Sequence, residues 1–176
     1  MKYPFFKSPL FFICLVLVCS SAVYSDGQLE TKTFFNDHLE IKIPAGFNVT
    51  NDDIVREEGS ENIMSRLICA GPYTVPAFTI TQYKSSICQD SIGIELESLA
   101  SQYKKDPSVK WIGSGVKLIN GHKVGYMEYV LYDDNYMLDF FTDVDGRYVA
   151  FRFICLTEQK KWVSASKEIM LSLKVK

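Results

Sequence analysis

Alternating apolar and polar positions predict a strand early in the chain. The segment 34–43 ends in strict alternation, with Leu39, Ile41 and Ile43 on one face and polar residues between them. Pro44 and the glycine two residues later end the strand. The segment 47–54 reads as a polar crossing between elements.

Two further strands, at 63–70 and 77–83, are predicted from their β-branched and apolar residues. The segment 71–76 between them contains one glycine and two prolines, which turn the chain. We therefore expect a hairpin with a long loop.

One internal helix follows. Asp90 or Ser91 can cap its start, and Pro107 prevents the helix from continuing further. The apolar positions recur every three or four residues, which places them on one face: Ile92, Leu96, Leu99 and Tyr103.

The second half of the chain predicts a meander of four strands and a final helix. The strands are expected at 109–119, 122–132, 136–142 and 147–156. Asn120-Gly121 is a strong two-residue hairpin signal, because both residues tolerate positive φ. Gly113 and Gly115 indicate a bulge or a close backbone approach. Thr157 can cap the final helix, whose inner face carries four apolar residues: Trp162, Ala165, Ile169 and Leu173.

Antiparallel hairpins with one helix in the middle and one at the end predict an α+β fold, a mostly antiparallel sheet with helices packed on it. The chain has 176 residues, of which 47% are apolar, 14% aromatic and 23% charged. That composition fits one folded domain rather than a disordered chain. The formal net charge of −2 argues against a general nucleic-acid binder, and two His argue against a His-rich metal site.

Residues 1–25 have the order of a secretory signal peptide. Lys2 and Lys7 precede an apolar run at 10–18, and small residues follow it. The run is about half the length that spans a bilayer, so we expect no membrane span. We expect cleavage after Ser25, with cleavage after Ala22 as the alternative, and a domain at 26–176 that is exported to the periplasm or secreted. We do not expect a lipid anchor at Cys19, because Val18 precedes it where a small residue is normally required.

The expected mature chain keeps Cys69, Cys88 and Cys155 and has 17 basic and 21 acidic residues, a net charge of −4. In an oxidising compartment we expect one disulfide among the three cysteines and one remaining thiol. Three pairings stay open.

The order of these elements resembles the Mog1/PsbP-like superfamily, and this chain is similar to an exported bacterial member. The resemblance rests on Ile-Pro-Ala-Gly-Phe at 43–47, the stretch 116–129, Phe-Phe-Thr-Asp-Val-Asp-Gly at 140–146 and a helix ending at 169–174. It implies an α-β-α sandwich that acts as an accessory factor, without catalysis. The metal-binding histidines of its photosynthetic members have no counterpart here.

Candidate chemistries fail on spacing. The Asp143 turn lacks the Glu that an EF-hand loop needs at its twelfth position, where Ile154 stands, although an acidic rim including Asp139 would suit a weak calcium site. Ser114 lies between glycines but not in a nucleophile elbow, and His38 and His122 are far apart in sequence. We therefore expect no enzyme and no cofactor.

Aromatic residues crowd the last three strands and most simply fill the core. The alternative is that outward tyrosines and acidic turns form a face for an unidentified protein partner. That candidate partner face comprises Tyr126, Tyr132, Tyr136, Asp133, Asp134, Asp143 and Asp145. We expect an exported accessory or binding protein, immunity-like or chaperone-like. The alternatives are an envelope protein that binds a small molecule or metal, and an undetected hydrolase.

Overall fold

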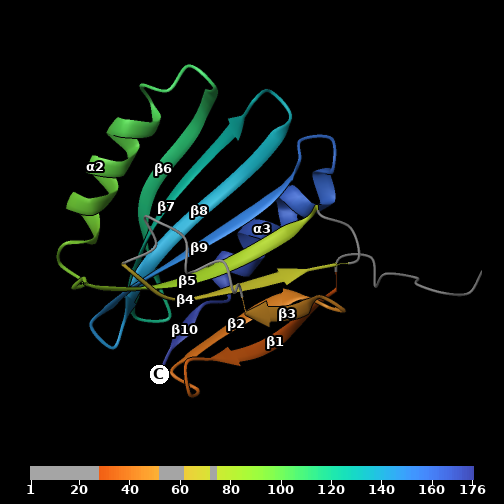
Figure 1. Ribbon diagram of the computed structural model, residues 1–176. Helices are drawn as coiled ribbons and strands as arrows, with labels where there is room; N and C mark the ends of the chain where they lie inside the picture. The colour runs from red at the N-terminus through yellow and green to blue at the C-terminus, as the bar shows by residue number, and fades with distance from the viewer. Residues whose placement is uncertain (1–27, 52–61, 72–74) are drawn as a thin grey trace, which may run out of the picture.

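The computed structural model describes residues 28–51, 62–71 and 75–176 (Figure 1). The expected signal peptide lies outside these ranges. Ten strands and two helices occur within them. The strands are β1 (Leu29–Phe34), β2 (Leu39–Pro44), β3 (Asn48–Asn51), β4 (Ile63–Ala70), β5 (Ala77–Ser86), β6 (Val109–Ile119), β7 (His122–Leu131), β8 (Asn135–Val144), β9 (Arg147–Leu156) and β10 (Lys174–Val175), and the helices are α2 (Ile92–Tyr103) and α3 (Lys160–Leu171).

The strands form two antiparallel sheets. The large sheet has the order β3-β4-β5-β9-β8-β7-β6, and the small sheet has the order β1-β2-β10. The expected hairpin appears as β4 and β5, and the expected meander appears as β6 to β9. The predicted α+β class is therefore confirmed.

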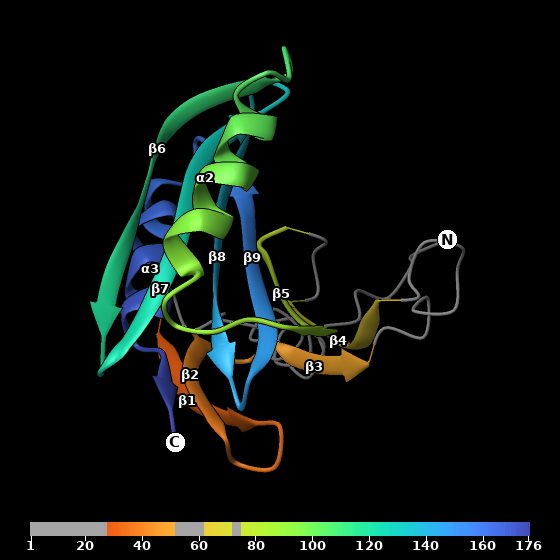
Figure 2. The same cartoon turned by 90° about the vertical axis from the view of Figure 1, so that its left-hand side faces the viewer.

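The helices lie on opposite faces of the large sheet (Figure 2). Helix α2 packs against β6 and β7, while α3 packs against β8, β9 and β2. This arrangement makes two apolar cores. The larger core lies among the large sheet, α3 and the small sheet, and the smaller core lies under α2.

The small sheet was only partly predicted. Leu39, Ile41 and Ile43 are fully buried, as their alternation predicts. Strand β1 was missed because Leu29–Phe34 is largely polar, and β10 because it has two residues. The segment expected to be a polar crossing contains β3. These strands depend on partners far away in the sequence, so local pattern does not reveal them.

Both helices carry the predicted apolar face, but neither has the predicted side-chain cap. Ser91 is the N-cap residue of α2, as predicted, but its hydroxyl makes no capping hydrogen bond, because it accepts from the Cys88 backbone N–H at 3.2 Å and donates to the Cys88 carbonyl oxygen. Helix α3 begins after Gln159, two residues later than a Thr157 cap requires. Ile92, Leu96, Ala165 and Ile169 are buried as expected, and Leu173 is also buried although it follows the end of α3.

Two glycine predictions are confirmed in the hairpin of β6 and β7. Asn120 and Gly121 both have positive φ, as a tight two-residue turn requires. The register shifts between Trp111 and Gly113, which is the expected irregularity in β6. A methyl group at Gly115 would lie 3.2 Å from the Tyr126 ring, so the backbone there is closely approached.

The expected disulfide is not formed. Cys69 and Cys155 are buried free thiols, and Cys88 is an exposed free thiol. Cys69 lies on β4 and Cys155 on β9, with β5 between them. Strands two places apart are separated by about 9–10 Å, beyond the roughly 7 Å that a disulfide can bridge.

Candidate binding face of the large sheet

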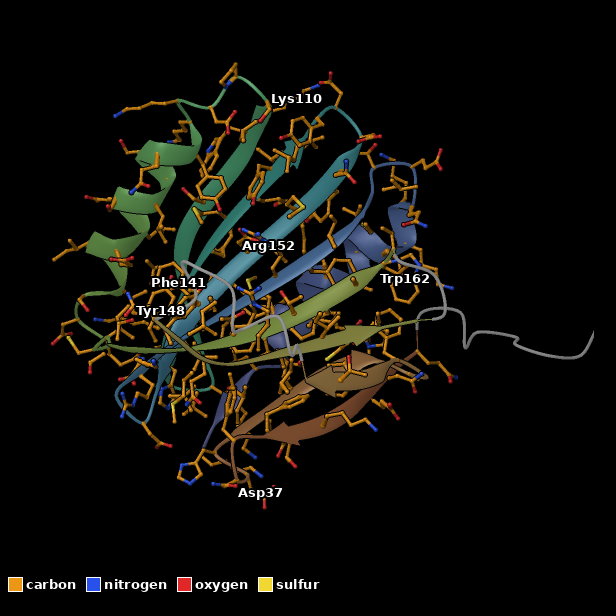
Figure 3. All side chains as sticks on the ribbon, viewed as in Figure 1. Asp37, Lys110, Phe141, Tyr148, Arg152 and Trp162 are labelled. Carbon is orange, nitrogen blue, oxygen red and sulfur yellow. The ribbon has the colours of Figure 1, made fainter. Side chains whose placement is uncertain are left out.

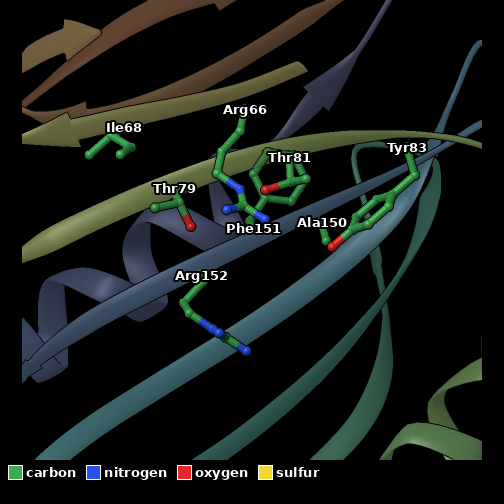
Figure 4. A pocket seen from close by; sticks show the side chains of 8 residues that line it. All are labelled: Arg66, Ile68, Thr79, Thr81, Tyr83, Ala150, Phe151 and Arg152. Atoms are coloured by element: carbon green, nitrogen blue, oxygen red, sulfur yellow. The ribbon is translucent and has the colours of Figure 1, made fainter. Parts of the chain in front are cut away.

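Helix α2 leaves part of the large sheet uncovered. On the side that faces α2, a hollow of about 300 Å³ lies over β4, β5 and β9 (Figure 4). We call this surface the arginine face, and its residues are Arg66, Ile68, Thr79, Thr81, Tyr83, Ala150, Phe151 and Arg152.

Strand register brings these side chains together. Thr81 of β5 pairs with Arg66 of β4 on one side and with Ala150 of β9 on the other. In the next row on the same side of the sheet, Thr79 lies between Ile68 and Arg152. Because side chains two residues apart point to the same side of a strand, both rows share one face. The small side chains in the middle of these rows leave room for the hollow.

Arg152 is held by a buried carboxylate. Its Nε and Nη2 donate to the two oxygens of Asp139 at 2.8 and 2.7 Å. Asp139 lies directly opposite Arg152 on β8, and its side chain is only 11% exposed, whereas the Arg152 side chain is 46% exposed. The paired guanidinium is therefore oriented by the protein while it remains partly open to solvent.

Two tyrosines complete the contacts of this ion pair. Tyr129 donates its hydroxyl to Asp139 at 2.9 Å, and Arg152 Nη2 donates to the Tyr103 hydroxyl of α2 at 3.0 Å. The hydrogen bonds from Arg152 to Asp139 raise the pKa of the guanidinium above its usual range, and burial raises the pKa of Tyr129. Arg152 stays charged and Tyr129 stays protonated at any physiological pH.

Aromatic side chains border the arginine face on the α2 side. Tyr83 meets Tyr148 edge-on, with ring centroids 5.2 Å apart, and Tyr148 stacks on Phe141 at 5.2 Å. Figure 3 shows Phe141, Tyr148 and Arg152 over the large sheet beside α2, while Trp162 lies toward α3. Tyr129, which donates to Asp139, packs with Phe141 and Tyr148 in the smaller core, so the ion pair is linked to the aromatic cluster under the helix.

The candidate partner face predicted from the sequence is not one surface. Its residues in the turn of β7 and β8 are Tyr132, Asp133 and Asp134, and its residues at the turn of β8 and β9 are Asp143 and Asp145. The ten residues of β8 separate the two turns by roughly 33 Å. Acidic residues at opposite ends of a strand cannot make a common rim.

The tyrosines of that candidate face also separate. Tyr132 is exposed at its turn, Tyr126 lies half-buried beside Lys117, and Tyr136 is 3% exposed. Tyr136 faces the larger core and donates its hydroxyl to Glu128 at 3.0 Å. Asp145 contacts His38 in the turn of β1 and β2.

Sequence reasoning missed the arginine face, although one signal was present. A two-residue turn at Asp145-Gly146 fixes the register of β8 and β9, and that register places Asp139 opposite Arg152. The contribution of Arg66 and the threonines could not be found in this way, because it depends on β5 pairing with β9, a strand distant in sequence.

Within the described ranges, no three His, Cys, Asp or Glu side chains gather as metal ligands would. None of the helices found there is long and apolar enough to cross a membrane.

No protein-family model matches the sequence, and no curated protein matches it. Solved structures do match. Cyanobacterial PsbP (CyanoP) from Synechocystis sp. PCC 6803 aligns over 89% of this chain and 96% of its own, with a TM-score of 0.58 and 12% identity. PA94 from Pseudomonas aeruginosa, a protein of unknown function, aligns over 85% and 98%, with a TM-score of 0.50 and 13% identity. LpqN, involved in cell envelope biogenesis of Mycobacterium tuberculosis, aligns over 84% and 90%, with a TM-score of 0.50 and 10% identity. These likenesses show that the chain has a Mog1/PsbP-like fold.

Proposed function

We propose that this chain is an exported, non-enzymatic accessory protein whose arginine face binds an acidic segment of a partner protein. The observation that carries this proposal is the hollow that α2 leaves open among the described residues, where the buried Asp139 orients Arg152. The similar structures include a protein involved in cell envelope biogenesis, which fits an accessory role outside the cytoplasm.

The chemistry of the arginine face suits carboxylates. Arginine presents several N–H groups in a planar fork that matches a carboxylate. Among the described residues, the hydrogen bonds of Arg152 use Nε and Nη2, and Nη1 carries none. Arg66 supplies a second guanidinium, which Figure 4 shows over β5 near Thr79 and Thr81.

The hollow suits a protein segment better than an enclosed small molecule. It is open, and its walls combine an apolar side chain, Ile68, with hydroxyls from Thr79, Thr81 and Tyr83. Tyrosine and arginine are favoured at protein interfaces because they combine contact area with hydrogen bonding. A partner side chain with a carboxylate would meet Arg152, while neighbouring residues would pack along the hydroxyl-bearing strand β5.

Export forms part of this proposal. The signal peptide at residues 1–25 would be removed, leaving Asp26 as the first residue. Intact mass measurement of the protein recovered from the extracytoplasmic fraction tests this. The proposal requires a chain that begins at 26, or at 23 for the alternative site, and a full-length chain retained in the cytoplasm would contradict it.

Site-specific cross-linking tests the binding face. A photoreactive residue in place of Tyr83 should capture a partner, and the same residue in place of the exposed Tyr132 should not. Arg66→Glu should abolish the Tyr83 adduct, whereas Lys174→Glu, the same charge change at an exposed site on β10, should leave it. An adduct that survives Arg66→Glu would overturn the proposed face.

A series of thermal-shift measurements distinguishes the proposed binding of an acidic segment from the alternative, a protein that binds a small molecule or a metal. A ligand that binds only the folded state raises the melting temperature with concentration. Divalent metals and lipids should leave the melting temperature unchanged, whereas a peptide rich in Asp and Glu should raise it in wild type and not in Arg66→Glu.

A further inference from the structure

The large sheet ends on one side in a long strand without a second neighbour. Strand β6 pairs with β7 alone among the described strands, and it runs for 11 residues along the outer margin of the molecule (Figure 2). The opposite edge is β3, which has four residues, three of them polar. Proteins blunt the edges of sheets with short strands, lysines or bulges. Strand β3 is short, whereas β6 is long and has its irregularity before Gly113 and a single lysine, Lys117, between there and the turn.

Strand β6 also exposes apolar side chains. Of the eight large hydrophobic residues exposed in the described part of the chain, three lie on it: Ile112 at 52%, Val116 at 44% and Leu118 at 74%. Val116 and Leu118 follow the irregularity at Trp111 and Gly113, so they share the face that α2 partly covers. They are neighbours on that face, beside the unpaired edge.

The tight turn determines which backbone groups point outward. With Asn120-Gly121 as a two-residue turn, Ile119 and His122 form a hydrogen-bonded pair. Hydrogen-bonded and non-hydrogen-bonded pairs then alternate along the hairpin. The N–H and C=O groups of Leu118, Val116 and Ser114 therefore point away from β7, toward the free edge. An extended chain can pair with such a row of donors and acceptors.

We infer that β6 pairs antiparallel with β6 of a second copy, about a two-fold axis at Val116. In that register the outward groups of Ser114 meet those of Leu118 of the second copy, and Val116 meets its own equivalent. Each Lys117 stands opposite Gly115, not opposite the other Lys117, and Gly115 has no side chain to obstruct it. The stretch between the irregularity and the turn is thus complementary to itself.

The unequal edges favour a closed dimer over a chain of molecules. Pairing β6 with β3 of another copy would leave most of the 11 residues of β6 unpaired, because β3 has four. Two copies that use the same edge instead make an isologous interface, which closes. This dimer does not depend on the arginine face, since β8 and β7 separate β6 from β4, β5 and β9 in the order of the sheet.

Analytical ultracentrifugation of residues 26–176 from micromolar to millimolar concentration tests the inference. Wild type should be a dimer at the upper end of the range. Val116→Lys, which brings two charges to the axis, should be a monomer throughout, and Val49→Lys, an exposed apolar site on β3, should still dimerise. A wild-type monomer at every concentration would overturn the inference, and so would a dimer that Val116→Lys leaves intact.

Oxidative cross-linking gives a second measurement of the register. In a Cys88→Ser background, Val116→Cys should form a disulfide between two copies, while Val49→Cys should not. Monomers that cross-link equally at both positions would contradict pairing at β6. A different outcome would also overturn the dimer. If the protein is a monomer and Val116→Lys abolishes the cross-link from position 83 to the partner protein, the edge of β6 pairs with a strand of that partner.

Discussion

Asp139 and Arg152 face each other across β8 and β9 in a bidentate pair whose two members differ in exposure. The Asp139 side chain is 11% exposed, while the Arg152 side chain is 46% exposed. Removing one partner of a buried pair is costly because it leaves the other charge without compensation. The cost here should therefore depend on which partner is removed.

Arg152→Met should destabilise the protein by about 2–4 kcal/mol, because it strands a buried carboxylate. Asp139→Asn should cost about 1 kcal/mol, since a partly exposed guanidinium can turn toward water. Urea unfolding of both variants measures the difference. The double variant Asp139→Leu/Arg152→Met should be more stable than Arg152→Met alone, and equal losses for the two single variants would contradict this account.

Gly125 on β7 pairs with Phe141 on β8 and lies against its ring. A methyl group there would lie 2.7 Å from Cζ of the buried Phe141. Gly125→Ala should therefore destabilise the protein by about 1–3 kcal/mol, as overpacked cores do. Gly93→Ala is the matched control, because nothing lies within 4 Å of that position in α2. The control should be neutral or stabilising by up to about 1 kcal/mol in thermal unfolding.

In the turn between β6 and β7, Asn120 contributes to stability through its backbone conformation and through its side chain. Asn120 has a φ of 48°, and its side-chain amide donates to the Leu173 carbonyl oxygen at 2.7 Å. Asn120→Ala loses the amide and strains the backbone, whereas Asn120→Gly loses the amide alone. Asn120→Ala should therefore be less stable than Asn120→Gly by roughly 1 kcal/mol in urea unfolding. Equal stability would show that the left-handed conformation costs nothing there.

The three described thiols should react at very different rates. Burial raises the pKa of Cys69 and of Cys155 to about 12, while hydrogen bonding to Ser91 lowers the pKa of the exposed Cys88. The thiolate is the reactive form, so a maleimide should label Cys88 first in the native protein. All three should react in urea.

The pH dependence of maleimide labelling follows from the lowered pKa of Cys88. A lowered pKa increases the thiolate fraction at neutral pH, so the Cys88 rate should rise with a midpoint below that of an ordinary thiol. Ser91→Ala removes the hydrogen bond, moves the midpoint upward and slows labelling at neutral pH. A midpoint that Ser91→Ala does not move would contradict the role of the Ser91 hydroxyl.

Near-neighbour patterns were enough to predict the elements whose partners are close in sequence. The alternation at Leu39 to Ile43, the spacing of Ile92 and Leu96, and the turn at Asn120-Gly121 each depend on a few adjacent residues, and the structure confirms all of them. These near-neighbour patterns were also enough to predict the α+β class. Strands β1 and β10 escaped because what makes them strands is pairing with β2, in one case across most of the chain.

The surfaces could not be predicted in the same way. A strand can show the same alternation of apolar and polar residues whether its second face is covered by a helix or open. The residues of β5 and β9 therefore do not reveal that α2 does not cover them. The two acidic turns look close in sequence, but the straight strand β8 holds them apart. The pairing of β5 with β9 likewise separates Cys69 from Cys155 and brings Arg66 into the same hollow as Arg152. Local residue order specified the strands and helices, whereas long-range strand pairing decided which side chains share a surface, because it sets distances that sequence spacing does not contain.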